Sequence, residues 1–401
     1  MRLFQVAKLL ANIPPLAKTK PTQFRRILLT GIASGPARLS VLKKDIPCSQ
    51  DGPLPVTDPT APVALITGAA GFIGSHVAHA LLDAGWRVIG LDSLNAYYDP
   101  ALKQARLDRL TPRPGFTAEI GKLEDPDRLM DLFATHRPTR VIHLAAQAGV
   151  RHSIDAPRDY LQANLIGTYE LLEAARAHPP EHMLLASTSS IYGANTEMPY
   201  RETDKVDTQM SFYAATKKAN EAMAHSYAHL YGLPITMFRF FTVYGPWGRP
   251  DMAYFKFTRA ILQGAPIDVY NNGEMRRDFT YIDDLVRAIV ALGDAVPGPT
   301  PVGAHDCLSP VAPFRSVNIG MNSPVALMDF IRAIETALGQ EARKNMLPMQ
   351  PGDVPATWAD TTLLRDLTGI QMTTNVTTGV QQFVDWYKSY HHDEAARPEP
   401  R

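Results

Sequence analysis

Residues 63–74 read Val-Ala-Leu-Ile-Thr-Gly-Ala-Ala-Gly-Phe-Ile-Gly, and this stretch decides the fold. The apolar run Val63–Thr67 is followed by three spaced glycines, and apolar residues at helical spacing come next. The pattern therefore predicts a strand, a tight turn and a helix. Gly68 permits the turn, Gly71 lets the backbone approach a pyrophosphate, and Gly74 lets helix and strand pack closely. The first N–H groups of the helix are suited to bind phosphate.

An acidic residue stands where a dinucleotide site needs one. The next predicted strand is Arg87–Asp92, and its last residue lies 18 positions after Gly74. A carboxylate there binds the adenosine ribose hydroxyls and repels a 2′-phosphate, so the sequence favours NAD over NADP. In the alternative reading the glycines only make turns, and the strand–turn–helix context together with Asp92 counts against it.

Strands and helices alternate from residue 63 to about residue 245. Further strand candidates are Thr117–Ile120, Arg140–Ala145, His182–Ser187 and Ile235–Phe241, and helical patterns, among them 160–177 and 213–230, lie between most of them. Continuous apolar strands separated by helices predict a parallel sheet covered on both faces. The expected fold is α/β, a doubly wound Rossmann sheet with a smaller α/β C-terminal substrate-binding domain.

The predicted domain organisation has four parts. They are a basic leader over 1–60, a NAD-binding domain over 61–244, a substrate-binding domain over 245–390 and a frayed tail over 391–401, with segments near 279–293 and 315–320 returning to the first domain. The leader has no acidic residue before Asp45 and many prolines. It is either an organelle transit peptide or a disordered or mis-started leader, and the prolines favour the latter because they break amphipathic helices.

Composition excludes several classes of protein. The 401 residues include 40 basic and 40 acidic side chains, so the net charge is zero and a nucleic-acid partner is not expected. Two cysteines, Cys48 and Cys307, exclude a disulfide scaffold and a multi-cysteine metal site, and they fit a reducing, cytoplasmic compartment. The sequence also offers no apolar run long enough to cross a membrane, so no membrane partner is expected. No metal is expected either, because the sequence signals no set of metal ligands.

Tyr213 and Lys217 are the first candidate catalytic pair. They stand four residues apart, which places a phenol and an ammonium on one helix face. A nearby cation favours the phenolate, so we expect Lys217 to lower the pKa of Tyr213 and make it a general base toward a sugar hydroxyl. The run Ser187–Ser190 follows a predicted strand, and a hydroxyl there can share the proton relay. In the alternative reading this run is a loop that caps a helix.

These motifs resemble the extended short-chain dehydrogenase/reductase superfamily, and longer stretches narrow the resemblance to the UDP-glucuronate 4-epimerase family. The stretches are Leu91–Asp99, Leu144–Arg151, Asn164–Thr168, Phe212–Glu221, Arg239–Ala253, Arg276–Asp284 and Gln350–Thr361. The resemblance covers residues 62 to about 390. It implies C4 epimerisation of UDP-glucuronate to UDP-galacturonate through a transient 4-keto sugar, with tightly held NAD, in a homodimer that serves polysaccharide biosynthesis.

The resemblance also implies site residues. Tyr213 is the base, Lys217 holds the nicotinamide ribose, and Thr188 takes the catalytic Ser/Thr position. The implied cofactor contacts are Gly68, Gly71, Phe72, Ile73, Gly74, Asp92, Asn95, Lys103, Leu123, Gln147, Asn164, Tyr213 and Lys217. The implied substrate contacts are Thr188, Ser189, Ser190, Thr242 and Arg249 around the sugar and its carboxylate, Arg277 at the diphosphate and Asp353 at the nucleotide ribose.

Related chemistries would leave different residues at these positions. By resemblance, a sugar 4,6-dehydratase would carry Asp-Glu at 189–190 and a UDP-glucuronate decarboxylase would carry Glu at 190, whereas both positions are serine here. A UDP-glucose/UDP-galactose 4-epimerase, the main alternative, would carry Asn at 242. A catalytically idle nucleotide-sugar sensor is a further alternative, and the intact Thr188, Tyr213 and Lys217 count against it. Ser93 and Lys122 depart from the family pattern near the cofactor, and the proline-rich stretch 297–313 is longer than typical.

Overall fold

The structure is a computed structural model that describes residue 58 and residues 60–350 and 354–395. Nearly all of the predicted leader over 1–60, Asp353 and the last residues of the predicted tail lie outside the described residues. Everything below concerns the part of the chain from Pro53 onward, which forms one compact unit.

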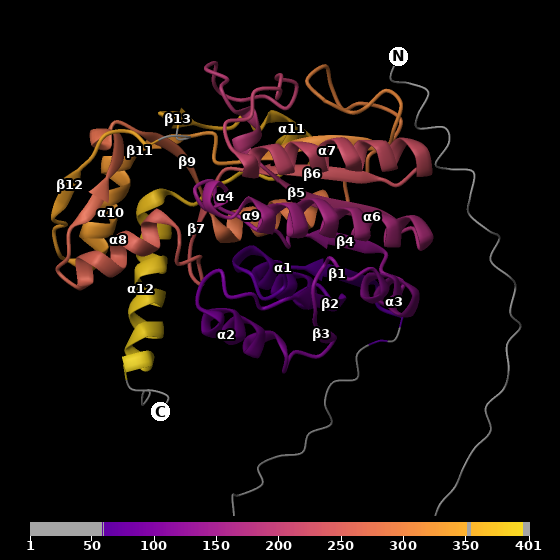
Figure 1. Ribbon diagram of the computed structural model, residues 1–401, viewed down its shortest axis with the longest axis horizontal. Coiled ribbons are helices and arrows are strands. Elements are labelled where there is room, and N and C mark those ends of the chain that lie inside the picture. Colours follow the sequence, from indigo (N-terminus) through magenta and orange to yellow (C-terminus); the bar gives the residue numbers. More distant parts are fainter. Residues whose placement is uncertain (1–57, 59, 351–353, 396–401) are drawn as a thin grey trace, which may run out of the picture. The chain divides into compact units, whose positions relative to one another are not determined.

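A parallel sheet organises this unit, as the alternating strands and helices predicted. In the described residues it has seven strands in the order β10-β6-β5-β4-β1-β2-β3 (Figure 1). They are β1 (Val63–Thr67), β2 (Arg87–Asp92), β3 (Phe116–Ile120), β4 (Arg140–His143), β5 (His182–Thr188), β6 (Ile235–Phe240) and β10 (Phe314–Ile319). The strand order reverses between β1 and β4, and in such sheets ligands bind at that point, beyond the carboxyl ends of the strands.

Side chains alternate between the two faces of this sheet. In β1, Ala64 and Ile66 join one apolar cluster, while Val63 and Leu65 join the other. Helices α1 (Phe72–Asp83) and α9 (Ile282–Leu292) cover the first face, and α3 (Pro126–His136), α6 (Gly167–Ala177) and α7 (Phe212–Tyr231) cover the second (Figure 1). Burial on both faces explains why the strands read as continuous apolar runs.

β4 ends two residues earlier than the predicted strand Arg140–Ala145. After His143 the chain turns toward the end of β1, where the backbone N–H of Leu144 donates to the Thr67 carbonyl oxygen at 3.1 Å and that of Ala145 to the Thr67 hydroxyl at 3.2 Å. The hydroxyl of Thr67 also meets the buried ring of His143 at 2.7 Å. These polar contacts replace the sheet ladder at the point where strand order reverses.

The predicted helix over 160–177 is not continuous. It is divided into α5 (Pro157–Tyr160), the π-helix η1 (Leu161–Ile166) and α6. The wide turn carries Asn164, whose side chain accepts from the backbone N–H of Gln147 at 2.8 Å and donates to its carbonyl at 3.1 Å. The π-helix therefore coincides with a side chain that leaves the helix to bind the loop after β4, a common use of such turns.

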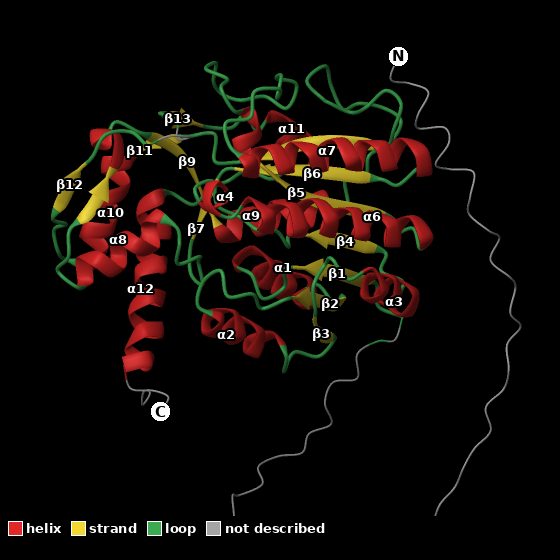
Figure 2. Ribbon diagram, in the orientation of Figure 1, coloured by secondary structure: helices red, strands yellow, loops and turns green. Residues whose placement is uncertain are grey.

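The remaining elements form smaller sheets and their covering helices (Figure 2). The strands are β7 (Thr242–Tyr244), β8 (Ile267–Val269), β9 (Arg276–Tyr281), β11 (Pro324–Ala326), β12 (Lys344–Met346) and β13 (Ala356–Thr357). The helices and turns not yet given are α2 (Pro100–Leu110), α4 (His152–Asp155), η2 (Ser189–Tyr192), α8 (Ala253–Leu262), η3 (Tyr270–Gly273), α10 (Leu327–Leu338), α11 (Thr362–Thr368) and α12 (Val376–Ala395). The division into a NAD-binding and a substrate-binding domain stays a prediction.

The first residues of the predicted frayed tail are helical. α12 continues to Ala395, five residues into the segment 391–401. The ring of His391 lies 4.2 Å from that of Tyr387 and 5.9 Å from that of Phe255 on α8, measured between ring centroids. These ring contacts supply a packing partner that the polar composition of the tail did not indicate.

A buried ion pair ties α7 to the middle of the large sheet. Glu221 on α7 accepts from Nε of Arg239 on β6 at 3.0 Å and from its Nη2 at 2.9 Å, and the two side chains are only 6% and 5% exposed. The hydroxyl of Ser187 on β5 donates to the same carboxylate at 2.6 Å. Two strands and one helix thus share one carboxylate just below the carboxyl edge of the sheet.

Replacing Glu221 by glutamine should destabilise the fold strongly. The substitution leaves Arg239 as a buried cation without its carboxylate, and removing one member of such a pair costs about 3–5 kcal/mol. We expect a corresponding fall in the free energy of unfolding measured with urea. The matched control is Asp329→Asn, which breaks a pair with Arg332 whose side chains are 60% and 71% exposed, and it should cost less than about 1 kcal/mol. An equal fall in the free energy of unfolding in both variants would contradict a special stabilising role for the buried pair.

Candidate active site

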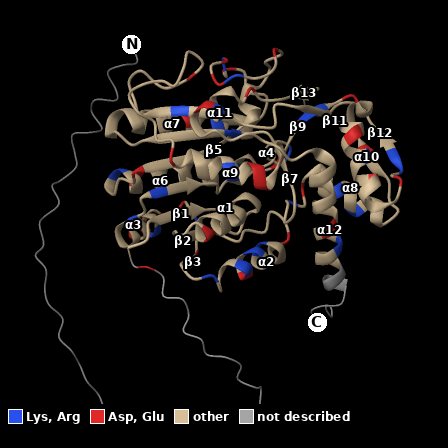
Figure 3. Cartoon of the chain, turned by 180° about the vertical axis from the view of Figure 1, so that it is seen from behind, with Lys and Arg blue, Asp and Glu red and all other residues tan. Residues whose placement is uncertain are grey.

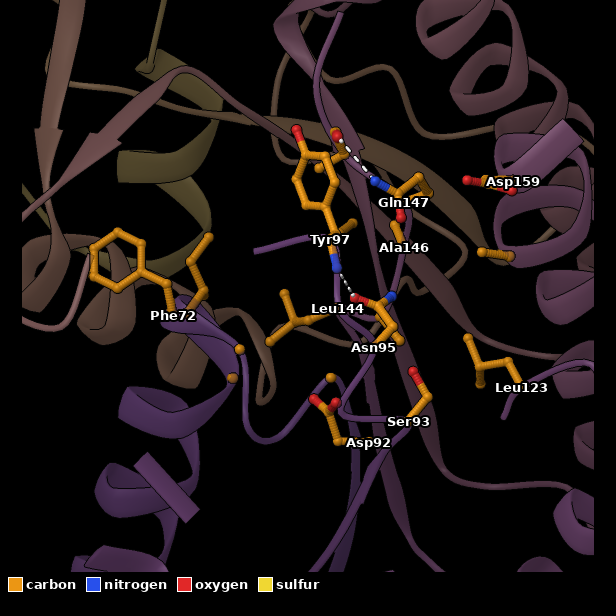
Figure 4. Close-up of a pocket in the computed structure, with 18 of the residues that line it drawn as sticks. Phe72, Asp92, Ser93, Asn95, Tyr97, Leu123, Leu144, Ala146, Gln147 and Asp159 are labelled. Carbon is orange, nitrogen blue, oxygen red and sulfur yellow. Dashed lines mark hydrogen bonds between the residues drawn. The ribbon is translucent and has the colours of Figure 1, made fainter. Parts of the chain in front are cut away.

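A pocket of about 710 Å³ lies beyond the carboxyl ends of the large sheet, at the point where strand order reverses (Figure 4). The loops after β1, β2 and β4 line it, together with residues from α7. The predicted cofactor residues that line it are Gly68, Gly71, Phe72, Ile73, Gly74, Asp92, Asn95, Lys103, Leu123, Gln147, Tyr213 and Lys217. Asn164 is the one predicted cofactor residue outside this lining. It is buried behind the wall, where it holds the main chain of Gln147, so the structure places it as a supporting residue.

The glycine loop leaves room for a closely approaching ligand. Gly68 has a φ of +77°, and a Cβ added to it would meet the Ala145 nitrogen at 2.8 Å. A Cβ on Gly74 would lie 2.0 Å from the Gly68 carbonyl oxygen. No side chain caps the N-terminus of α1 at Gly71, so the helix end keeps its N–H groups for a ligand. The loop therefore has the shape and donors that a pyrophosphate requires.

Asp92 and its neighbours form the far side of the pocket, as Figure 4 shows. The Asp92 carboxylate accepts from the backbone N–H of Ala70 at 3.0 Å and from that of Leu94 at 2.8 Å. Lys103 on α2 donates to the carbonyl and side-chain oxygens of Asn95 at 2.7 and 2.6 Å. Burial lowers the pKa of Lys103. These contacts hold an acid and an amide at the end of β2, where an adenosine ribose would meet them.

Tyr213 and Lys217 both face the pocket from α7. Ser211 caps this helix by accepting from the Ala214 N–H at 3.1 Å, which sets the position of the first turn. Lys217 donates to the Ala186 carbonyl oxygen on β5 at 2.9 Å, and burial lowers the pKa of Lys217 to about 8. The hydroxyl of Thr188 at the end of β5 interacts with the Tyr213 phenol in the direction that lowers its pKa. The structure thus brings together the three residues that the sequence predicted as a catalytic set.

Lys217 by itself does not produce the predicted lowering of the Tyr213 pKa. Burial raises the pKa of Tyr213, and the hydrogen bond to Thr188 and the positive charge of Arg249 offset this only in part. The ammonium of Lys217 is directed to the Ala186 carbonyl and is itself buried, so it does not overcome the loss of solvent around the phenol. Further positive charge in the pocket is needed to favour the phenolate.

A second, smaller cavity of about 180 Å³ holds most of the predicted substrate residues. Ser189, Ser190, Thr242 and Arg277 line it. The hydroxyl of Thr188 lies 3.3 Å from that of Ser190, so Thr188 stands between this cavity and Tyr213. The guanidinium of Arg277 donates to the carbonyl oxygens of Val354 at 2.7 Å and Pro355 at 3.1 Å. Asp353, the remaining predicted substrate contact, lies outside the described residues.

Arg249 does not line the same cavity as the hydroxyls predicted to share its ligand. It lines the larger pocket, and its guanidinium pairs with the carboxylate of Asp251, with Nε to Oδ1 at 3.0 Å and Nη2 to Oδ2 at 2.6 Å. The Tyr97 hydroxyl donates to the same carboxylate at 3.3 Å. Sequence reasoning assigned no role to Asp251 or Tyr97, although the Arg-Pro-Asp order places an acid two residues after Arg249.

Arg106 is a further residue that sequence reasoning missed. It lies on α2, whose basic residues are marked in Figure 3, and its side chain is fully buried. It donates to the carbonyl oxygens of Ala70, Trp247 and Gly248 at 3.2, 2.6 and 3.0 Å, and to the Tyr98 hydroxyl at 2.7 Å. One guanidinium therefore links the glycine loop to the segment that carries Arg249. Its spacing from Lys103 on the same helix face was the available signal.

The residues that the structure describes show neither a membrane-spanning helix nor a cluster of metal ligands. No helix there combines the length and apolar character needed to cross a bilayer. Within the same residues, His, Cys, Asp and Glu side chains do not gather in groups of three or more that would suit a metal ion. The expectation of a cytoplasmic protein stays a prediction.

Comparison with known families decides the classification. The model of the NAD-dependent epimerase/dehydratase family matches residues 64–302, more than half of the chain. The chain belongs to this family. Among curated relatives in the family, a probable UDP-glucuronate 4-epimerase of Rhizobium meliloti (strain 1021) is 54% identical over 327 residues, which cover 80% of this chain and 96% of the relative.

Further relatives agree with this classification. UDP-glucuronate 4-epimerase 1 of Arabidopsis thaliana is 47% identical over 332 residues, covering 82% of this chain and 77% of the relative. Among solved structures, UDP-glucuronic acid 4-epimerase from Bacillus cereus, in complex with UDP-glucuronic acid and NAD, is similar with a TM-score of 0.74 and 32% identity. That similarity covers 82% of this chain and 99% of the Bacillus chain.

Substituting Gly74 by alanine should weaken NAD binding. The added Cβ would lie 2.0 Å from the Gly68 carbonyl oxygen, so the loop must move from the position in which its N–H groups can meet phosphates. Overpacking of this kind costs about 1–3 kcal/mol, and we expect a loss of about tenfold or more in NAD affinity measured by calorimetry.

The matched control is Gly298→Ala. A Cβ there meets no atom within 4 Å, so NAD affinity should match that of the parent protein. Parent-like NAD affinity in Gly74→Ala would remove the glycine loop from the proposed cofactor contacts.

Proposed function

We propose that this chain is an NAD-dependent UDP-glucuronate 4-epimerase that interconverts UDP-glucuronate and UDP-galacturonate. One observation carries the proposal: Tyr213 lines the dinucleotide pocket, and Thr188, whose hydroxyl acts to lower the pKa of Tyr213, also lies 3.3 Å from the Ser190 hydroxyl of the Ser/Thr cavity. A base at this junction can reach a hydroxyl on a sugar placed between the two cavities. Relatives with this name and 54% and 47% identity support the same activity.

The residues of the larger pocket fit a dinucleotide. The glycine loop and the uncapped start of α1 suit the pyrophosphate, and the Asp92 carboxylate suits a ribose without a 2′-phosphate. When bound, oxidised NAD accepts hydride from the sugar C4 and returns it, and it adds positive charge beside Tyr213. Burial raises the pKa of Tyr213, and the positive charge of the bound cofactor would lower it again. Cofactor binding would therefore favour the phenolate.

The protein's own part in the reaction is proton transfer and control of the sugar. Tyr213 takes the proton of the C4 hydroxyl, and Thr188 holds the phenol in line through its hydrogen bond. The 4-keto sugar then turns about its diphosphate linkage, which Arg277 at the edge of the smaller cavity is placed to anchor. Tyr213 returns the proton to the C4 oxygen after the opposite face of C4 has been presented.

The intermediate creates a hazard that the site must control. A 4-keto uronic acid is a β-keto acid and can lose carbon dioxide, so an epimerase must restrain the C6 carboxylate. Arg249, in the larger pocket, provides a guanidinium that binds carboxylates in a bidentate fashion, whereas the hydroxyls of Ser189, Ser190 and Thr242 line the neighbouring cavity and can bind the sugar from there. We assign Arg249 as the main restraint on the carboxylate.

Incubation with two sugar nucleotides tests the proposal. Purified protein is given UDP-glucuronate or UDP-glucose, without added NAD, and products are identified by proton NMR. We expect UDP-galacturonate from the first substrate and no product from the second. UDP-galactose from UDP-glucose would instead assign a neutral-sugar epimerase. No product from either substrate, while NAD is present in the protein, would favour a catalytically idle nucleotide-sugar sensor.

The variant Tyr213→Phe separates chemistry from binding in the same assay. It removes only the hydroxyl, so NAD content and UDP-glucuronate binding should be kept while turnover falls about 10²- to 10⁴-fold, the usual contribution of a positioned base. A variant with the parent's rate would remove the assignment of Tyr213 as the base.

The homodimer is part of the same proposal. Exposed apolar side chains gather on η1, α6 and the two ends of α7, helices that lie side by side in Figure 1. They are Leu161, Ile166, Tyr169, Phe212, Leu230 and Tyr231. Apolar surface of this kind is typical of a protein–protein interface, and α6 and α7 of each subunit would bury it against a second copy.

Light scattering tests the dimer. We expect the mass of two chains of 44.2 kDa each, and Leu230→Glu should shift the protein toward a single chain. Leu230 is 64% exposed, so the substitution should leave the fold of one chain intact. The control Met346→Glu changes an exposed apolar residue on β12, which pairs with β8 in a small separate sheet, and it should leave the mass unchanged. A parent protein that runs as one chain would overturn the dimer.

A further inference from the structure

The guanidinium of Arg249 is already held by a carboxylate of the same chain. Asp251 accepts from Nε and from Nη2, a side-on bidentate pair in which both side chains are about a quarter exposed. Burial raises the pKa of Asp251, but the charge and hydrogen bonds of Arg249 outweigh this and lower it overall. Asp251 is therefore ionised at neutral pH and the pair is a true ion pair.

The main chain around Arg249 is fixed by other contacts, so the ion pair acts on the side chain alone. Arg106 holds the carbonyl oxygens of Trp247 and Gly248, and the Arg249 N–H donates to the Tyr254 hydroxyl at 3.3 Å. The four rotatable bonds of the arginine remain to be ordered. Asp251 supplies that order, and the Tyr97 hydroxyl, donating at 3.3 Å, fixes Asp251 in turn.

The two members of the pair differ in where they face. Arg249 lines the larger pocket near Tyr213, whereas Asp251 is not part of the pocket wall. The pair uses two of the five N–H donors of the guanidinium and one of its edges. The edge that carries Nη1 is thus the one available to a second carboxylate.

We infer that Asp251 is a positioning residue that aims Arg249 at the sugar carboxylate and thereby suppresses decarboxylation of the 4-keto intermediate. The inference rests on the proposed function. In the side reaction, the C5–C6 bond breaks and carbon dioxide leaves. The bonding pair passes toward the C4 carbonyl to form an enolate, which takes up a proton at C5. The product is a 4-keto pentose, or the pentose after hydride return. Without Asp251, the Arg249 side chain would exchange among several rotamers. Its guanidinium would then bind the C6 carboxylate for only part of the lifetime of the intermediate.

The share of pentose among all products tests this inference. UDP-glucuronate is turned over by the full-length protein with its retained NAD, and pentose and hexuronate nucleotides are counted by chromatography and NMR. Asp251→Ala should raise the pentose share by about tenfold or more over the parent, on the scale of a lost charged hydrogen bond. Asp251→Asn, which keeps the shape and one acceptor, should raise it less. Tyr97→Phe should shift it in the same direction by the smallest amount.

Two comparisons make the experiment decisive. Arg249→Ala should give the highest pentose share, and Asp83→Ala, which removes the acid of a surface pair with Arg113, should give the parent's share. The inference is overturned if the Asp251 variants lose rate or stability at an unchanged pentose share, because a merely structural residue would behave in that way. It is also overturned if Arg249→Ala leaves the share unchanged. A parent protein that makes no UDP-galacturonate overturns the proposed function itself, and that outcome is visible before any variant is compared.

Discussion

The site depends on a single buried carboxylate. Glu221 holds α7 against β5 and β6 through Arg239 and Ser187, and α7 carries Tyr213 and Lys217 two turns and one turn earlier. The same guanidinium reaches the Tyr192 hydroxyl at 3.0 Å, at the end of the turn that carries Ser189 and Ser190. Because an unpaired charge at this depth is costly, the pair leaves α7 little freedom to slide along the sheet. The buried pair thus helps to fix the positions of Tyr213, Thr188 and the serines at 189 and 190 relative to one another.

The protein's own electrostatics oppose ionisation of Tyr213. Burial raises the pKa of Tyr213 and lowers that of Lys217 to about 8, so both groups tend toward their neutral forms. Arg249, the other cation nearby, is neutralised by Asp251. The positively charged nicotinamide ring of oxidised NAD would therefore add the charge that favours the phenolate of Tyr213. This arrangement couples activation of the base to occupancy of the dinucleotide pocket.

Local signals predicted much of the fold, and they failed where distant polar groups intervene. Strands β1 and β2 match the predicted boundaries because apolar burial on both faces leaves a continuous pattern, and the glycine loop and Tyr213–Lys217 spacing carry their geometry in sequence. The end of β4 and the π-helix η1 were missed because Thr67 and Asn164 act on loops far away in the chain. The pairing of Arg249 with Asp251 was missed for a different reason, since the two residues are close in the sequence. Resemblance assigned the arginine to a ligand, and only coordinates show which charge it meets.

The contacts of Arg106 bear on how this enzyme could change. Its guanidinium bridges Ala70 in the glycine loop and the Trp247–Gly248 carbonyls beside Arg249, with no carboxylate among these partners. Because Arg106 contacts both segments, we expect a displacement of one to disturb the other, which would link dinucleotide binding to the proposed restraint of the sugar acid. Mutations selected for looser cofactor exchange would then carry a penalty in product fidelity. Evolution toward a decarboxylase could therefore begin with substitutions on α2, away from the residues proposed to bind the sugar carboxylate.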